Sequence, residues 1–156
     1  MGDSKKVGLK KIVSDSMEKL AFMFFVSDAF REPIQFQDAV TAEVSYTGIF
    51  SGRLAMVITE PALTELAANM LGIDTEDVEQ NHLHDALKET VNIICGNWLP
   101  IEGGDEAVFH IDAPRVLSPS EAAASLTSQP AILEKMSVDE EPCDIYFFKN
   151  EFDKLA

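Results

Sequence analysis

Apolar residues recur at intervals of three and four in several segments of the chain, which is the spacing of one helix face. This pattern predicts a first helix over residues 9–30, and Pro33 marks its exit. It predicts another helix over residues 82–99, which Pro100 limits. Each helix is expected to bury its apolar side, and the aromatic residues at 22–25 are expected in the core.

A shorter helical pattern lies between these two, and both of its ends carry signals. Thr59 or Glu60 stands at the cap, and Pro61 occupies the first helical position, where its missing N–H costs nothing. Gly72 follows the last apolar position, as at many helix ends. The sequence therefore predicts a second helix between Pro61 and Gly72.

Alternating segments predict the β-strands. Residues 40–47 and 52–59 are rich in β-branched side chains and predict a hairpin. The segment "EAVFHIDAPRVL" predicts a strand ending at Pro114, and 118–130 predicts a loop or a short extra helix. "AILEKMSV" and "CDIYFFKNEF" predict a final antiparallel pair, with the aromatics at 146–148 in the core. Because helices and strands fall in blocks, we expect an α+β fold in which helices pack an antiparallel sheet, as a single domain over 1–156.

The third predicted helix carries two opposite stripes. One stripe is apolar and suits burial; its residues are Leu87, Val91, Ile94 and Trp98. The other is polar and faces outward; its residues are Asp85, Glu89, Asn92 and Gly96, with Ile93 at its border. A glycine inside a helix costs about 1 kcal/mol relative to alanine, so Gly96 suggests that something approaches the backbone there. The same stripe also fits an ordinary solvated helix face, and spacing alone does not decide between the two.

Composition narrows the class of partner. The formal net charge is -15, which argues against nucleic acid and against an anionic membrane as partners. No apolar run approaches the roughly 20 residues of a membrane helix, and Cys95 and Cys143 form no CxxC pair. We therefore expect a cytoplasmic protein with two reduced thiols. The three histidines have no metal-ligand spacing, and no P-loop, nucleophile elbow or dinucleotide fingerprint is present.

Two blocks of sequence resemble the CheC/CheX/FliY phosphatases of bacterial chemotaxis. "DALKETVNIICGN" is similar to their signature helix, an acidic or Ser residue followed by E-x-x-N and, about two dozen residues later, a proline. Here these positions are Asp85, Glu89, Asn92 and, at slightly shorter spacing, Pro114. "VSYTGIFSGRLAMVITEPALTELAANMLG" resembles the CheX hairpin and the helix after it. The chain looks like a CheX-like member, with a CheC-like fold and one signature helix.

The resemblance implies an enzyme, a protein-aspartyl-phosphate phosphatase in chemotaxis or two-component signalling. Its substrate would be a phosphorylated CheY-like receiver domain of a response regulator, which brings its own Mg²⁺, so no cofactor or metal of its own is expected. Glu89 and Asn92 would be catalytic: Asn92 would hold the water and Glu89 the lysine of the receiver. Asp85, Ile93 and Gly96 would dock the receiver. The resemblance also implies a homodimer joined through sheet edges.

The first helix offers Ser14 and Glu18 but Ala21 where the asparagine should stand, so we expect no catalysis there. Departures after Asn97 include Pro100, which would shorten the signature helix and affect docking. Two alternatives therefore stay open beside the phosphatase. One is a non-catalytic module that binds a receiver or a flagellar component, and the other is a purely structural dimer.

Overall fold

The computed structural model describes residues 8–150. The helices are α1 (Leu9–Ala21), α2 (Glu60–Leu71), α3 (Gln80–Gly103) and α4 (Pro119–Leu126), with short 3-10 turns η2 (Phe36–Asp38) and η3 (Thr75–Asp77). The strands are β1 (Val26–Ser27), β2 (Val40–Thr47), β3 (Gly52–Ile58), β4 (His110–Ile111), β5 (Arg115–Leu117), β6 (Ile132–Val138) and β7 (Glu141–Lys149).

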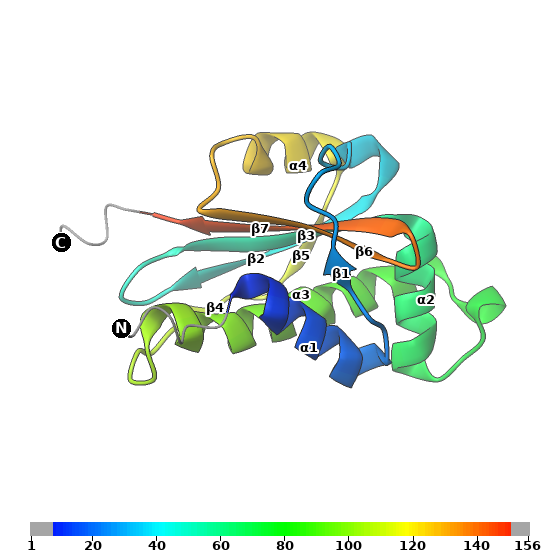
Figure 1. The fold of residues 1–156 in the computed structure, drawn as a ribbon, viewed down its shortest axis with the longest axis horizontal. Helices are drawn as coiled ribbons and strands as arrows, with labels where there is room; N and C mark the ends of the chain where they lie inside the picture. Colours follow the sequence, from blue (N-terminus) through cyan, green and yellow to red (C-terminus); the bar gives the residue numbers. More distant parts are fainter. Residues whose placement is uncertain (1–7, 151–156) are drawn as a thin grey trace.

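One antiparallel sheet forms the middle layer. Its strand order is β1-β6-β7-β3-β2-β4, and β5 also pairs with β2. Figure 1 shows α1, α2 and α3 on one side of this sheet and α4 on the other. The α+β class with an antiparallel sheet packed by helices is confirmed.

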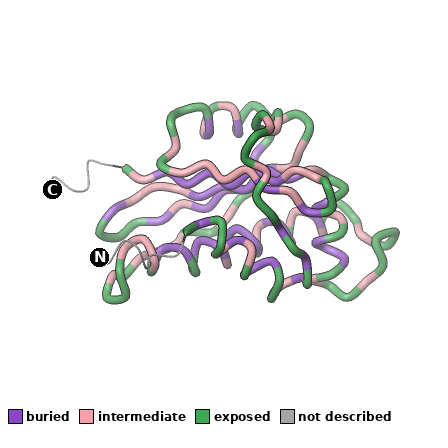
Figure 2. Tube along the Cα trace, in the orientation of Figure 1, coloured by how far each residue is buried: buried purple, intermediate pink, exposed green. Residues whose placement is uncertain are grey.

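Both faces of the central strands are covered, which explains their nearly unbroken apolar sequence. In β3, Leu54 and Met56 pack with α1, α2 and α3, whereas Ala55 and Val57 pack on the side of α4. In β7, Phe147 belongs to the first of these cores and Phe148 to the second. Successive side chains of a strand point to opposite faces, so a strand covered on both sides is buried at every position. Figure 2 shows this buried centre between exposed outer turns.

The expected first helix is too long, because α1 ends at Ala21. Phe22 follows with φ 56°, in the left-handed region, and β1 begins four residues later at Val26. Met23 and Phe25 are buried, while Phe22 and Phe24 are exposed. This alternation is that of a strand, so the expectation that all the aromatics at 22–25 lie in the core is wrong. A short apolar run fits either period, and packing decides between them.

The expected end of the third helix is also wrong. α3 continues through Pro100 to Gly103, and the backbone N–H of Gly104 caps it by donating to the Pro100 carbonyl. Proline inside a helix removes one backbone hydrogen bond without necessarily ending the helix. Trp98, Leu99 and Ile101 pack into or against the core, and this burial holds the helix together across Pro100.

Most other elements agree with the sequence. The hairpin strands β2 and β3 pair with Val40 opposite Ile58. Thr59 is the N-cap residue of α2, and Gly72 ends it with φ 69°. Residues 118–130 contain the short helix α4. The final pair β6 and β7 turns at two residues with positive φ, Asp139 and Glu140, in place of a glycine.

The strand expected up to Pro114 differs from the structure. It is split into β4 and β5, which pair with different parts of β2. Pro114 lies between them and has no N–H to give to a sheet ladder. The last residues of the expected final strand, 151–152, lie outside the described part of the chain.

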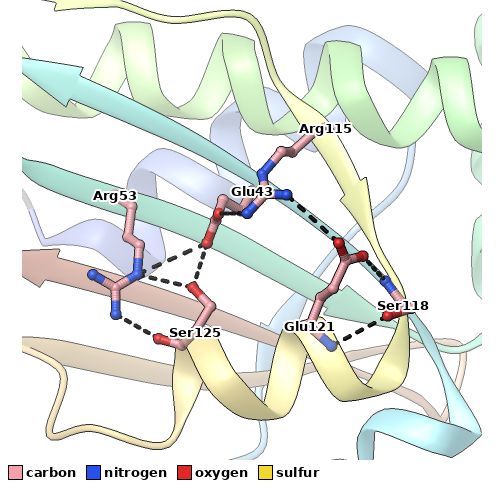
Figure 3. A network of polar contacts seen from close by, with 6 residues as sticks. All are labelled: Glu43, Arg53, Arg115, Ser118, Glu121 and Ser125. Atoms are coloured by element: carbon pink, nitrogen blue, oxygen red, sulfur yellow. Dashed lines mark hydrogen bonds and ion pairs between the residues drawn. The ribbon is translucent and has the colours of Figure 1, made fainter.

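A polar network joins α4 to the sheet, as Figure 3 shows. Glu43 of β2 is buried, and Arg115 of β5 donates to its Oε2 at 3.1 Å. Ser125 of α4 donates to Oε1 of Glu43, and the Arg53 guanidinium donates to the Oγ and the carbonyl of Ser125. Ser118 caps α4 with Glu121 in a capping box. Each charged side chain has a partner inside the network, so we assign the network a structural role.

A second ion pair fastens the segment after β1. Arg31 donates to the fully buried carboxylate of Asp144 at 2.6 Å and to the Met136 carbonyl at 2.7 Å. The other carboxylate oxygen of Asp144 accepts from the backbone N–H of Ile34 at 2.8 Å. These bonds hold residues 31–34 against β6 and β7.

No helix within residues 8–150 is long and apolar enough to cross a membrane.

Candidate functional site

The polar stripe of α3 lies on the surface of the molecule. Asp85, Glu89, Asn92 and Gly96 are all exposed, and Ile93 at the border is partly buried. The opposite stripe of Leu87, Val91, Ile94 and Trp98 is buried. The prediction of one buried and one exposed stripe on this helix is therefore confirmed. The sequence alone did not decide the function of the exposed stripe.

The stripe stands on a rigid support. α3 packs against α1, α2 and β2. Its first turn is fixed by a capping box in which His82 Nδ1 accepts from the Glu79 backbone N–H at 2.9 Å. The Thr90 hydroxyl of α3 is buried and donates to the Ala86 carbonyl at 2.7 Å. Side chains on such a helix are positioned more precisely than on a loop.

Two polar side chains of the stripe have no interaction partner among the described residues. Within residues 8–150, neither the Glu89 carboxylate nor the Asn92 amide has a hydrogen bond or an ion pair. Asp85 lies 3.7 Å from Lys88, a surface ion pair of small energy. A free carboxylate and a free amide one turn apart can contact the same group on another molecule.

Gly96 has no reason within the described chain to be a glycine. A Cβ built on it meets nothing within 4 Å, and its φ is not in the left-handed region. In contrast, a Cβ on Gly103 would meet the Phe109 ring at 2.8 Å and displace it, so packing accounts for that glycine. The cost of Gly96 to the helix therefore has no internal compensation, which suits an approach by another molecule.

α1 flanks the stripe but repeats only part of its pattern. Asn97 Nδ2 of α3 donates to Ser16 Oγ of α1 at 3.1 Å, which ties the two helices together. In α1, Ser14 donates to the Phe25 carbonyl at 3.0 Å and Glu18 is exposed. Ala21, at the place of the asparagine, is fully buried. This helix therefore offers no second amide at the surface.

Sequence reasoning missed a groove beside the stripe. It has a volume of about 200 Å³ and is lined by Leu20, Met70, Leu71, His82, Asp85, Ala86 and Glu89. The groove brings together the C-terminal ends of α1 and α2 with the first half of α3. No pattern in one segment indicates it, because its walls come from residues far apart in the sequence.

The chemistry available at this site is positioning rather than nucleophilic attack. Burial raises the pKa of Cys95, on the inner side of α3, to about 12, so its thiol stays protonated and is a poor nucleophile. Within the described residues, no group of three or more His, Cys, Asp or Glu side chains is arranged to hold a metal ion. The exposed amide and carboxylate can orient a water or pair with a cation.

A comparison with protein-family models identifies a family for this chain. Residues 40–135 match the family model described as "Chemotaxis phosphatase CheX". The stretch includes β2, β3, α2 and the whole of α3. No curated protein matches the sequence.

Several solved structures share the fold. One is the CheX-CheY-BeF3-Mg2+ complex from Borrelia burgdorferi, with a TM-score of 0.72 and 16% identity over 92% of this chain and 96% of that chain. CheX from Vibrio vulnificus has a TM-score of 0.71 and 17% identity over 91% and 93%. FliY from Thermotoga maritima has a TM-score of 0.58 and 12% identity over 94% and 87%. Because the family model covers more than half of the sequence, the chain belongs to the CheX family of chemotaxis phosphatases.

Proposed function

We propose that this protein hydrolyses the aspartyl phosphate of a CheY-like receiver domain in chemotaxis or a related two-component pathway. Its family is described as a chemotaxis phosphatase, and a similar chain was solved with CheY, BeF3 and Mg2+. The observation that carries the proposal is the pair Glu89 and Asn92, which are exposed on α3 and have no partner within residues 8–150. A cytoplasmic location stays a prediction.

The chemistry needs little from the phosphatase. An aspartyl phosphate is already activated, and the Mg²⁺ of the receiver neutralises charge on the phosphoryl oxygens, so the missing part is a positioned water. The carbonyl oxygen of the Asn92 amide accepts a hydrogen bond from that water, and its NH₂ group donates to a phosphoryl oxygen. The water bonds to phosphorus as the bond to the aspartyl oxygen breaks, which releases phosphate and restores the aspartate.

Glu89 has a separate role in this mechanism. Its carboxylate accepts a charge-assisted hydrogen bond from the active-site lysine of the receiver. This pair fixes the register between the two proteins, and Asn92, one turn along the same exposed stripe, then points at phosphorus. Asp85, Ile93 and Gly96 form the docking surface around the pair. Gly96 allows the receiver to approach the helix backbone.

The alternative is a non-catalytic binding module. One argument for it, the shortening of α3 by Pro100, does not hold. Pro100 does not shorten α3, because the helix continues to Gly103. The helix therefore extends beyond Gly96 and Asn97, and the docking surface keeps its support. The purely structural dimer does not account for an uncommitted amide and carboxylate on the same exposed stripe.

A homodimer joined at a sheet edge is part of the proposal. β6 pairs with β1 only at Met136 and Ser137, so within residues 8–150 the start of β6 has no strand on its outer side. An open edge of this kind presents backbone groups that can pair with another chain. Sedimentation of the purified protein tests this, and a monomer at micromolar concentration contradicts it.

The matched pair Glu89→Ala and Glu18→Ala tests the phosphatase. Both residues are exposed on neighbouring helices, but only Glu89 belongs to the complete motif. A charge-assisted hydrogen bond contributes about 1.5–3 kcal/mol, so Glu89→Ala should slow receiver dephosphorylation by about tenfold to a hundredfold. Glu18→Ala should leave the rate unchanged. Equal rates for Glu89→Ala and the unmodified protein would refute the assigned role.

A further inference from the structure

We propose that the groove beside Glu89 is a specificity pocket that receives one apolar side chain of the receiver domain, next to a basic residue. This inference rests on the proposed function and deepens it. The groove shares two of its walls, Asp85 and Glu89, with the outward stripe of α3. A receiver that pairs its lysine with Glu89 therefore covers the groove as well.

Most of the residues that line the groove are apolar. They are Leu20, Met70, Leu71 and Ala86, and Leu71 is 51% exposed although it is a large hydrophobic residue. A volume of about 200 Å³ is below the range of about 300–1,000 Å³ of pockets that bind whole small molecules, and it suits a single side chain. An exposed apolar site with a polar rim is typical of a protein interaction surface.

The residue that ends α1, next to the groove, has an unfavourable backbone conformation for its side chain. Phe22 follows Leu20 by two residues, adopts the left-handed conformation at φ 56°, and is 81% exposed. Glycine is the usual residue at such a helix end, and a bulky side chain there is unfavourable. The Asn69 side chain of α2 donates to the Ala21 carbonyl at 2.9 Å and thereby fixes this turn beside α2. The fold thus holds an aromatic side chain in solvent at an energetic cost, as proteins do at functional sites.

Charge decides between a receiver and a second copy of this chain. In a two-fold contact through the groove, each copy would present the same residues to the other. The carboxylates of Asp85 and Glu89 in one copy would then face the same carboxylates of the other copy, in a protein whose net charge is -15. Like charges brought together and desolvated oppose such a contact. A partner with an apolar side chain beside lysine or arginine matches both the groove and its acidic rim.

The test is binding of a CheY-type receiver from the same organism, charged with beryllofluoride and Mg²⁺, to single variants. Leu71→Ala and Phe22→Gly should each weaken binding by about tenfold, the effect of truncating one anchor residue. Ile49→Ala is the control, because Ile49 is 57% exposed but lies in the β2–β3 turn. Its affinity should match that of the unmodified protein. Phe22→Gly should not lower the melting temperature, because glycine accepts the conformation at position 22.

Kinetics separate this inference from the phosphatase proposal. In dephosphorylation, Leu71→Ala should raise KM about tenfold and leave kcat unchanged, because the groove binds but does not take part in chemistry. Unchanged affinity in both Leu71→Ala and Phe22→Gly, a fall in kcat alone, or a loss of self-association instead of receiver binding would overturn the inference. If affinity depends on Leu71 but no receiver loses phosphate faster, the groove stands and the phosphatase proposal fails. If no receiver binds, both fail.

Discussion

Gly96 and Pro100 lie four residues apart in α3, and both are exposed on its outer side. In a regular helix the residue at 100 would donate its backbone N–H to the carbonyl at 96, but proline has none. The backbone at Gly96 therefore lacks both a side chain and its usual helical donor. These two features coincide one turn beyond Asn92, on the face that we assign to the receiver.

Gly96→Ala should separate stability from function. Because a Cβ at this position meets nothing within 4 Å, alanine should raise the free energy of unfolding by about 1 kcal/mol. The same methyl group would stand between the helix and the docked receiver, so receiver affinity should fall. Urea unfolding and receiver titration of one sample measure both effects. A stable variant with full affinity would remove Gly96 from the docking surface.

Pro100→Ala should stabilise the helix on its own. Alanine supplies the N–H that the Gly96 carbonyl lacks, and proline inside a helix costs about 3 kcal/mol, so we expect a gain of up to that size. Thermal unfolding checks this. A lower melting temperature would mean that the helix is adapted to the proline ring rather than weakened by it.

Arg31→Ala should be strongly destabilising. It leaves the fully buried Asp144 carboxylate without its cation, and breaking a buried pair from one side costs about 3–5 kcal/mol. The milder comparison is Lys11→Ala, which removes a surface ion pair with Asp15 at 3.1 Å and should cost less than about 1 kcal/mol. Chemical denaturation ranks the two. Equal losses would show that the Arg31 pair has no special weight.

Much of the fold was predictable because local signals and packing agree. Pro61 lies in the first turn of α2 and Gly72 follows its last residue, as their backbone preferences require, and the alternating strands around the β2–β3 turn form the expected hairpin. The prediction was wrong at Phe22 and at Pro100, where local preference and packing disagree. Buried Met23 and Phe25 pull the chain into an extended path, and buried Trp98 and Leu99 carry the helix across a proline.

The candidate site divides in the same way. The spacing of Asp85, Glu89, Asn92 and Gly96 was sufficient to place them together on one exposed face, because a single helix sets their geometry. The groove was not predictable, because Leu20 and Leu71 meet Glu89 only after three helices pack. The sequence also could not show that the Asn92 amide and the Glu89 carboxylate lack partners, because this depends on the position of every neighbouring side chain.

The two cysteines should make the fold sensitive to alkali. Burial raises the pKa of Cys95 from 9.0 to about 12, and burial raises the pKa of Cys143 as well. The folded-state values exceed the unfolded ones, so this stability is fully present below about pH 8.5 and is lost as pH rises toward the folded values. Each thiol should reduce the free energy of unfolding by about 1.4 kcal/mol per pH unit above pH 9.

Urea unfolding between pH 8 and pH 11 measures this loss. The double variant Cys95→Ala, Cys143→Ala should be less stable at pH 8, because it leaves cavities, but its stability should depend less on pH. The same pH dependence in the double variant would assign the alkaline loss to other groups.

The central claim is that one exposed amide, Asn92, positions the attacking water, and the decay of a phosphorylated receiver tests it most directly. The receiver is charged with phosphate, mixed with excess protein and followed to completion. The unmodified protein should accelerate phosphate loss, and Asn92→Ala should return decay to the rate of the receiver alone while still binding its beryllofluoride form. Full acceleration by Asn92→Ala would contradict the account.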